Sequence, residues 1–163
     1  MNQIYTHPKR KTKVVFVQLG SPSEPTSKAL RKYLRKFLGD PRVVDINPWL
    51  WKIILNFFVL PFRPKKSAKL YARIWDGKSF PLITNTRDFT NNVRQELKKI
   101  DPDGHVEVNH AFLLSPPYVN EVYDRWEEDL KKGIGATKLL VIPMFPQYSE
   151  STIASGIDAL AKE

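Results

Sequence analysis

The stretch KVVFVQLGSP, from Lys13 to Pro22, decides the fold class of this chain. Five of its first seven residues are β-branched or apolar, and Gly20, Ser21 and Pro22 then interrupt the run. A strand that is apolar along its whole length is typical of a parallel sheet buried on both faces. The stretch therefore predicts a buried parallel strand that opens into a loop at Gly20.

Helix and strand patterns alternate along the rest of the chain. Further strands are predicted at residues 42–46, 105–114 and 138–142. Helices are predicted at residues 26–38, 48–60, 67–75, 86–100, 115–132 and 151–162. Pro61 and Pro64 are expected to break the chain between two helices, and Thr86 and Ser149 or Ser151 to cap others. This alternation predicts an α/β fold, a parallel sheet with helices on both faces.

Length and composition indicate a single globular domain. The chain has 163 residues, of which 42% are hydrophobic, enough for a substantial buried core. Residues 1–12 are charged and lack an apolar run, so we expect a flexible N-terminal tail there and one domain over residues 13–163. The absence of cysteine excludes disulfides and thiolate metal sites within this segment and fits a reducing compartment.

The distribution of charge is uneven. Residues 1–75 contain 16 lysines and arginines and three acidic residues, a formal charge of +13, whereas residues 76–163 carry −4. This asymmetry predicts an anionic partner for the first half. Nucleic acid, an acidic membrane surface and a carboxylate-bearing small molecule all satisfy that condition.

An apolar run meets a basic one in WLWKIILNFFVLPFRPKKSAKLYARIW, from Trp49 to Trp75. We expect this stretch to form a lip that presents apolar surface and cations together. The cations can solvate a helix start, or they can pair with carboxylates. Alternatively, residues 49–62 rest on a membrane surface while the lysines meet anionic headgroups. Lys52, Asn56 and Pro61 interrupt the run, so we expect a soluble, cytoplasmic protein that can bind peripherally to a membrane.

Ligands of open parallel sheets bind beyond the carboxyl ends of the strands. In this chain those ends are the loops at residues 20–25, 113–117 and 143–151. The first loop lacks the further glycines of a dinucleotide-binding fingerprint, and the chain has no GxxxxGK[ST] phosphate loop. The histidines, His7, His105 and His110, show no helical metal-ligand spacing. His110 shares a strand face with apolar residues, which predicts a hydrogen-bonded core histidine.

Four segments together resemble the N-terminal half of a ferrochelatase. They are VQLGSP (Val17 to Pro22), KFLGDPRVV (Lys36 to Val44), LPFRPKKSAKLYARIW (Leu60 to Trp75) and PMFPQYSESTIAS (Pro143 to Ser155). The resemblance implies one of the two Rossmann-like lobes of a chelatase-like fold, with a porphyrin cleft between the lobes. It also implies the activity of a lyase that inserts Fe²⁺ into a porphyrin in heme biosynthesis.

The resemblance implies substrate-binding positions. Leu19 matches a position against the porphyrin face, Arg63 a basic position that meets propionate or substrate, and Lys66, Tyr71 and Ser79 nearby cleft positions. The family's PQYSxST loop, at the cleft floor, is matched by Gln147, Tyr148, Ser149, Ser151 and Thr152.

Two departures from the family pattern bear on activity. Many relatives carry Arg-Tyr where this chain has Leu113-Leu114, within Phe112-Leu113-Leu114-Ser115. The family's catalytic His and its partner Glu lie in the C-terminal lobe, beyond Glu163. We therefore expect no catalytic residue, metal ligand or bound cofactor in this chain, which alone would be inactive; Fe²⁺ and porphyrin are substrates of the full enzyme.

Two other functions stay open. One is a non-catalytic porphyrin- or heme-binding module, which the two departures favour. Nucleic-acid binding is disfavoured, because the basic half contains no recognised module. The expected partners are a porphyrin and either a C-terminal lobe or a second copy of the chain, since a single lobe should expose one apolar wall of its cleft.

Overall fold

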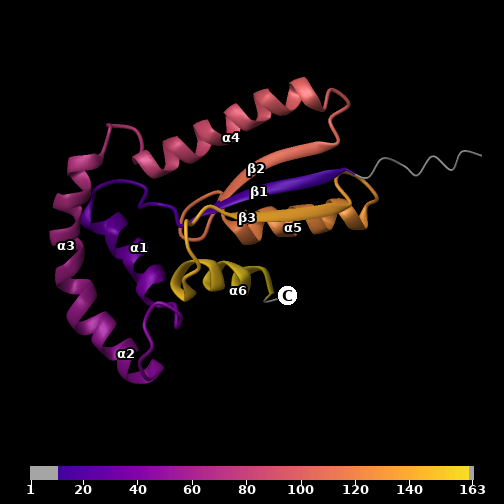
Figure 1. Ribbon diagram of the computed structural model, residues 1–163. Coiled ribbons are helices and arrows are strands. Elements are labelled where there is room, and N and C mark those ends of the chain that lie inside the picture. Colours follow the sequence, from indigo (N-terminus) through magenta and orange to yellow (C-terminus); the bar gives the residue numbers. More distant parts are fainter. Residues whose placement is uncertain (1–10, 162–163) are drawn as a thin grey trace, which may run out of the picture.

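The computed structural model of the chain describes residues 11–161 and contains a three-stranded parallel sheet (Figure 1). The strands are β1 (Thr12–Gln18), β2 (Val106–Phe112) and β3 (Lys138–Pro143). Their order is β2-β1-β3, so β1 lies in the centre and pairs in parallel with both neighbours. The four residues from Val14 to Val17 are all buried. The prediction of a buried central strand is therefore confirmed.

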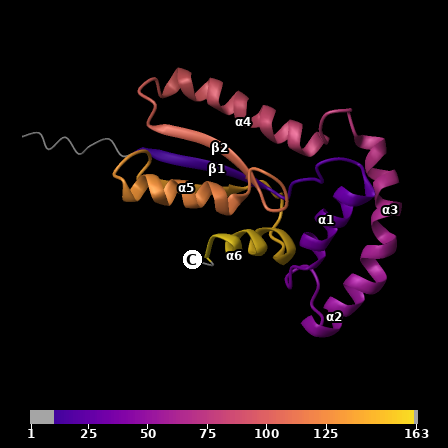
Figure 2. The same cartoon turned by 180° about the vertical axis from the view of Figure 1, so that it is seen from behind.

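Helices cover both faces of this sheet. The α-helices of the described residues are α1 (Ser27–Leu38), α2 (Pro48–Ile54), α3 (Leu60–Tyr71), α4 (Pro81–Ile100), α5 (Val119–Lys131) and α6 (Ser155–Ala161). Shorter turns complete the chain: the π-helical η1 (Leu55–Val59) and η3 (Glu150–Ala154) and the 3₁₀ turn η2 (Ala72–Ile74). One face lies under α4 and the other under α5 and α6 (Figures 1 and 2). This arrangement confirms the predicted α/β fold.

Each face of β1 belongs to its own apolar cluster because side chains alternate along a strand. On the α4 side, Val14 and Phe16 pack with Val93 and Leu97, and the rings of Phe16 and Phe89 meet edge-on at 5.1 Å. The opposite side carries Val15, Val17 and Ala111 with partners that include Val122, Ala159 and Leu160.

A third apolar cluster joins α1 to a helical arm, formed by α2, η1 and α3, that lies beyond the carboxyl ends of the strands (Figure 1). Leu34 and Leu38 of α1 pack in it with Leu55 and Leu60 of the arm. The indole Nε1 of Trp51 donates to the carbonyl of Leu38 at 2.7 Å.

No helix within residues 11–161 is long and apolar enough to cross a membrane.

The prediction that Pro61 and Pro64 end a helix is wrong. The chain stays helical from Pro48 to Tyr71 through η1, and the separate helix predicted from residue 67 belongs to α3. Pro61 lies in the first turn of α3, where a missing N–H is tolerated. Pro64 leaves the carbonyl of Leu60 without its helical donor, and Arg31 Nε donates to that carbonyl instead, at 3.1 Å.

Three other predicted details are also wrong. Residues 42–46 form no strand, because the amides of Val43 and Val44 both bond the Asp40 carbonyl in a turn. Helix α4 begins at Pro81 and not at a Thr86 cap; Thr86 is buried, and its hydroxyl donates to the Leu82 carbonyl at 2.7 Å. Ser149 precedes η3, but neither its side chain nor that of Ser151 caps the helix.

Element boundaries shift slightly elsewhere. Strand β1 begins at Thr12, one residue before its predicted start, and residues 1–10 of the expected tail, with His7, lie outside the described residues. Helix α5 begins at Val119, after the Ser115-Pro116-Pro117 segment at which we expected it to start.

His110 is half-buried on β2, where its ring meets that of Phe112 edge-on at 5.6 Å. Burial lowers the pKa of its imidazole, and the charges of Arg94 and Arg87 lower that pKa further. Its Nδ1 is buried and has no hydrogen-bond partner among residues 11–161. The prediction of a hydrogen-bonded core histidine is therefore wrong as regards Nδ1.

The hydrogen bond from Arg31 should stabilise the arm at its proline. We expect Arg31→Met to lower the free energy of unfolding by about 1 kcal/mol, because it leaves the Leu60 carbonyl without a donor. Urea denaturation measures the change, and Lys28→Met, an exposed lysine on the same helix, is the matched control. Equal losses in the two variants would contradict this role.

Candidate functional site

The three loops predicted to bind ligand lie together at the carboxyl ends of the strands. The amide of Leu114 donates to the Leu19 carbonyl at 2.9 Å, and the amide of Met144 donates to the Val17 carbonyl at 2.9 Å. Gln18 Nε2 also donates to the Met144 carbonyl, at 3.0 Å. The ladder of the sheet thus continues into the loops and fixes their relative positions.

Gly20 allows the first of these loops to pass close to the second. Its φ of 91° is a backbone conformation that residues other than glycine rarely adopt. A Cβ atom at this position would also overlap Ser115 Oγ. The Ser21 amide donates to the same Oγ at 3.3 Å. The glycine therefore brings the loops of β1 and β2 into direct contact at the edge of a pocket.

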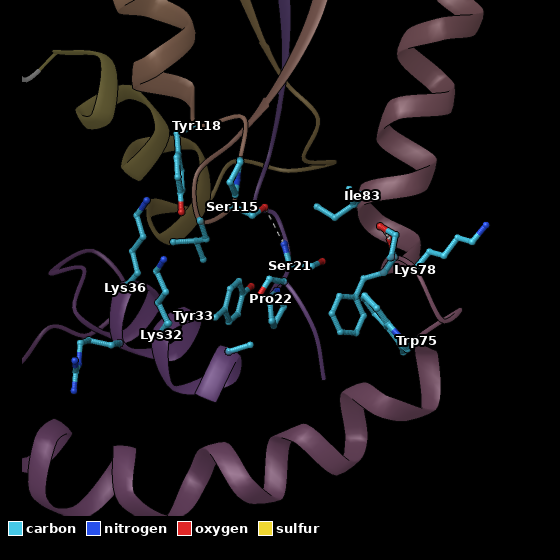
Figure 3. A pocket seen from close by; sticks show the side chains of 17 residues that line it. Ser21, Pro22, Lys32, Tyr33, Lys36, Trp75, Lys78, Ile83, Ser115 and Tyr118 are labelled. Atoms are coloured by element: carbon cyan, nitrogen blue, oxygen red, sulfur yellow. Dashed lines mark hydrogen bonds between the residues drawn. The ribbon is translucent and has the colours of Figure 1, made fainter. Parts of the chain in front are cut away.

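This main pocket has a volume of about 680 Å³ and lies between α1, the start of α4 and the loops of β1 and β2 (Figure 3). Its lining combines an apolar wall, serine hydroxyls and cations. The apolar wall includes Pro22, Tyr33, Trp75, Phe80, Ile83 and Leu114. The serines are Ser21, Ser23, Ser79 and Ser115, and the cations are Lys32, Arg35, Lys36 and Lys78.

Aromatic contacts hold the apolar wall in place. The ring of Tyr71 meets the ring of Tyr33 at 6.3 Å and that of Phe80 at 5.5 Å, and Trp75 meets Phe80 at 4.7 Å. The Tyr33 hydroxyl donates to the Gly20 carbonyl at 3.4 Å. Burial raises the pKa of Tyr33, and Tyr71 raises it further, so the phenol remains a neutral donor. Tyr71 therefore acts behind the pocket wall, where it supports Tyr33 and Phe80.

Two lysines of α1 mark the cationic side of the pocket. Lys36 Nζ lies 3.8 Å from the centre of the Tyr118 ring, and Lys32, one turn earlier, points to the same side (Figure 3). Burial lowers the pKa of Lys36, an effect that Glu121 opposes and Lys32 reinforces. Lys32 and Lys36 were not among the residues predicted to bind substrate, because lysines on an amphipathic helix usually lie on its solvated face. Their i, i+4 spacing was the signal that both share one face.

Ser79 enters the main pocket from a tight turn. The Asp76 carboxylate accepts from the amides of Lys78 and Ser79, at 2.7 and 2.5 Å. These hydrogen bonds lower the pKa of Asp76. Gly77 supplies the φ of 93° that the turn requires.

A second pocket, of about 420 Å³, adjoins the first, and both are lined by Lys36 and Leu114. Leu19 and Ser151, both predicted to bind substrate, line it together. Arg42 and Asp158 also line it and form a bidentate ion pair, in which Nη2 lies 3.0 Å from Oδ1. The pair joins the turn after α1 to α6.

The other residues predicted to bind substrate do not line these two pockets. Arg63 and Lys66 are exposed on α3, and Gln147 and Tyr148 are exposed in the loop after β3. Ser149 bonds to Ser151 through their hydroxyls at 2.9 Å. Thr152 donates to the Ser149 carbonyl at 3.3 Å and lines a third pocket, of about 210 Å³, near β3.

The residues from 11 to 161 contain no group of three or more histidine, cysteine, aspartate or glutamate side chains that could hold a metal ion. Leu113 and Leu114, of the segment in which the resemblance implied a departure from the family pattern, both line the second pocket. The chemistry that these pockets offer is binding: apolar contact, hydroxyl hydrogen bonds and pairing of lysines with anions.

Fold and pockets define the class: an α/β lobe with an apolar, lysine-bearing pocket at the carboxyl ends of a parallel sheet. The family follows from sequence comparison. Residues 11–163 match the family described as Ferrochelatase, and the chain belongs to that family.

Three relatives show the extent of the similarity. A ferrochelatase of Idiomarina loihiensis is 43% identical over 150 residues, which are 92% of this chain and 40% of the relative. A ferrochelatase of Teredinibacter turnerae is 39% identical over 163 residues, 99% of this chain and 43% of the relative. Ferrochelatase 1 of Shewanella oneidensis is 40% identical over 150 residues, 91% and 42% of the two chains. The chain thus spans about two-fifths of the length of these curated relatives.

The ion pair of Arg42 and Asp158 should hold α6 beside the second pocket. We expect Arg42→Ala to speed hydrogen exchange of the α6 amides severalfold, because local opening then breaks fewer contacts. The control is Arg73→Ala, an exposed arginine outside both pockets. Unchanged α6 exchange in Arg42→Ala would show that the pair does not restrain this helix.

Proposed function

We propose that this chain forms the N-terminal lobe of a ferrochelatase over residues 13–163, and that the complete enzyme inserts Fe²⁺ into a porphyrin in heme biosynthesis. The observation that carries the proposal is the combination, in one pocket, of an apolar wall and the Lys32–Lys36 pair. A porphyrin with carboxylate side chains is flat, largely apolar and anionic at its rim. Family membership supports the same substrate class.

The main pocket suits one side of such a ligand. Its volume of about 680 Å³ lies in the range of small-molecule sites. The porphyrin face would lie on the apolar wall, and Lys32 and Lys36 would pair with carboxylates. Leu19 and the residues of the PQYSxST loop would contact the ligand from the second pocket and its rim.

Arg63, Lys66 and the helical arm form a lip in this proposal. Trp49 and Phe57 are 79% and 70% exposed, and Phe58 and Phe62 are similarly open. Together with Lys52 and the basic residues of α3, this surface fits peripheral contact with an anionic membrane. Arg63 and Lys66 would then meet substrate carboxylates at the lip.

In the proposed reaction, this lobe binds and orients the porphyrin. Insertion requires the loss of two pyrrole N–H protons to a base whose pKa lies near the working pH. The resemblance places that base, a histidine, in the C-terminal lobe, and Fe²⁺ enters as a substrate. We therefore assign no catalytic residue to this chain.

The chain alone should not insert metal. We expect no turnover when the purified chain is mixed with porphyrin and Zn²⁺ or Fe²⁺, because the proton acceptor is missing. Absorbance of the metalloporphyrin measures the reaction, and a full-length relative such as that of Idiomarina loihiensis is the positive control. Robust turnover would contradict the assignment of the base to the second lobe.

Porphyrin should bind to the purified chain. The pocket lysines, such as Lys36, and the cations of the lip, such as Arg63, should both contribute to the affinity. Lys36→Ala and Arg63→Ala are each expected to weaken binding about fivefold, since each removes one solvent-exposed ion pair. Absorbance titration with a dicarboxylate porphyrin measures affinity, and Lys28→Ala is the matched control, because Lys28 is exposed on α1 and lines neither pocket. No spectral change at high protein concentration would count against the proposal.

The second candidate is a non-catalytic porphyrin- or heme-binding module. Leu113 and Leu114 favour it, because they put apolar side chains where many relatives have a cation and a phenol. A chimera that joins this chain to a relative's C-terminal lobe separates the two functions. It is made in two forms, without and with the restoring substitutions Leu113→Arg and Leu114→Tyr. Insertion without the restoration supports the enzyme, and binding without insertion in either form supports the module.

A further inference from the structure

A further pocket, of about 290 Å³, lies beside β2, an outer strand of the sheet, with α4 on one face and α5 on the other (Figures 1 and 2). We call it the edge pocket. It shares no lining residue with the two pockets of the candidate site. Its charged and polar lining residues are Lys13, Arg94, Glu107, Asn109, His110 and Arg125, and Pro117 and Val122 complete the lining.

Arg94 reaches this pocket from α4 and is held in one orientation. Its Nε donates to the Val108 carbonyl at 2.7 Å. Its Nη1 and Nη2 donate to the side-chain oxygens of Asn91 and Asn109, at 3.0 and 2.9 Å. A guanidinium has five N–H donors, so each terminal nitrogen keeps one N–H for a further acceptor.

Cations outnumber carboxylates in the edge pocket. Lys13, Arg94 and Arg125 line it as cations, and Glu107 is the one carboxylate in the lining. The side chain of Lys13 is only 13% exposed, and its Nζ lies 3.5 Å from the Glu107 carboxylate. Neither arginine takes part in an ion pair among residues 11–161. The pocket therefore has an excess of positive charge that favours an anion.

A backbone amide of β2 supplies another donor at this edge. In parallel pairing, successive residues of a strand direct their N–H and C=O groups to opposite sides. The odd-numbered His105 and Leu113 bond to β1, so the even-numbered Val108 and His110 face away from it. Arg94 satisfies the carbonyl of Val108, whereas the His110 N–H has no acceptor among residues 11–161. An anion in the edge pocket would provide that acceptor.

We propose that the edge pocket binds a phosphate dianion, either free phosphate or the phosphate group of a small soluble compound. Arg94 and Arg125 would donate to its oxygens from the two helices, and Lys13 would face it from β1. The His110 amide would donate to it from the strand edge. Guanidinium and backbone N–H groups form short, charge-assisted hydrogen bonds with phosphate oxygens.

The size and lining of the pocket limit the ligand. Its volume of about 290 Å³ lies at the lower end of the range of small-molecule sites. Pro117 and Val122 are the apolar residues of the lining, which offers little surface to an acyl chain. A soluble phosphate compound therefore fits better than a phospholipid. The proposal does not depend on porphyrin binding, because the edge pocket shares no residue with the candidate site.

An NMR titration of single amides tests this proposal. The probes are inorganic phosphate and glycerol 3-phosphate, added to the purified chain at an ionic strength kept constant with chloride. We expect both probes to shift the His110 amide resonance in a saturable way, because this N–H gains an acceptor. The tighter of the two identifies the source of the phosphate group. The Met144 amide already donates to the Val17 carbonyl at 2.9 Å and is the internal control.

Charge variants test the assigned residues in both directions. Arg125→Gln should weaken phosphate binding about fivefold, since it removes one exposed ion pair. Glu107→Gln should tighten binding about fivefold, because it removes the carboxylate that repels the ligand, and a misfolded variant cannot produce such a gain. The matched controls are Arg73→Gln, at an exposed site outside the pocket, and Glu128→Gln, which likewise frees a lysine from an ion pair. Both controls should leave the affinity unchanged.

Three results would overturn the proposal. The first is a shift of the His110 amide that does not saturate and that chloride reproduces, because it would show screening alone. The second is an equal change of affinity in each variant and its control, because binding would then follow the overall charge of the chain. The third is a shift of this amide by vesicles that contain phosphatidic acid but by neither soluble probe, which would assign the pocket to a lipid.

Discussion

The parallel pairing of β1 with both β2 and β3 is the constraint on which the rest of the structure depends. A strand paired on both edges and covered on both faces must be apolar throughout, and the run from Val14 to Val17 meets that requirement. Because all three strands run in one direction, their carboxyl ends meet at one edge of the sheet. The loops that leave those ends are joined by backbone hydrogen bonds, which continue the ladder. The site therefore lies at this edge as a consequence of the strand pairing.

The main pocket combines residues that are far apart in the sequence. Lys36 comes from α1 and the ring beneath its ammonium group, Tyr118, from the segment before α5. Close approach of these segments depends on Gly20, which lets the β1 loop lie against Ser115. The cations of the pocket come from α1 and from the turn before α4, whereas those of the lip, Arg63 and Lys66, are exposed on the arm.

The helical arm shows how a local rule can be overridden by a tertiary contact. Proline removes a backbone donor, which was the reason to end helices at Pro61 and Pro64. In the fold, a π-helical turn precedes Pro61, and Arg31 from α1 supplies a donor to the carbonyl that Pro64 leaves free. No pattern within the arm itself contains that arginine. Similarly, the apolar residues 43 and 44 are consistent with a strand, yet they form a turn that packs on the cluster of α1 and the arm.

The sequence by itself determined the parallel α/β class, the carboxyl-end location of the site and the family, because apolar periodicity and ordered motifs are local signals. Leu19 and Ser151 line one pocket and Ser79 lines another, whose wall Tyr71 supports from behind. Only the tertiary structure decided that Lys32 and Lys36 face a pocket and that the arm continues through its prolines. Each of these features depends on a contact between segments that are distant in the sequence, such as the hydrogen bond from Arg31 to the Leu60 carbonyl. A local sequence pattern does not contain both partners of such a contact.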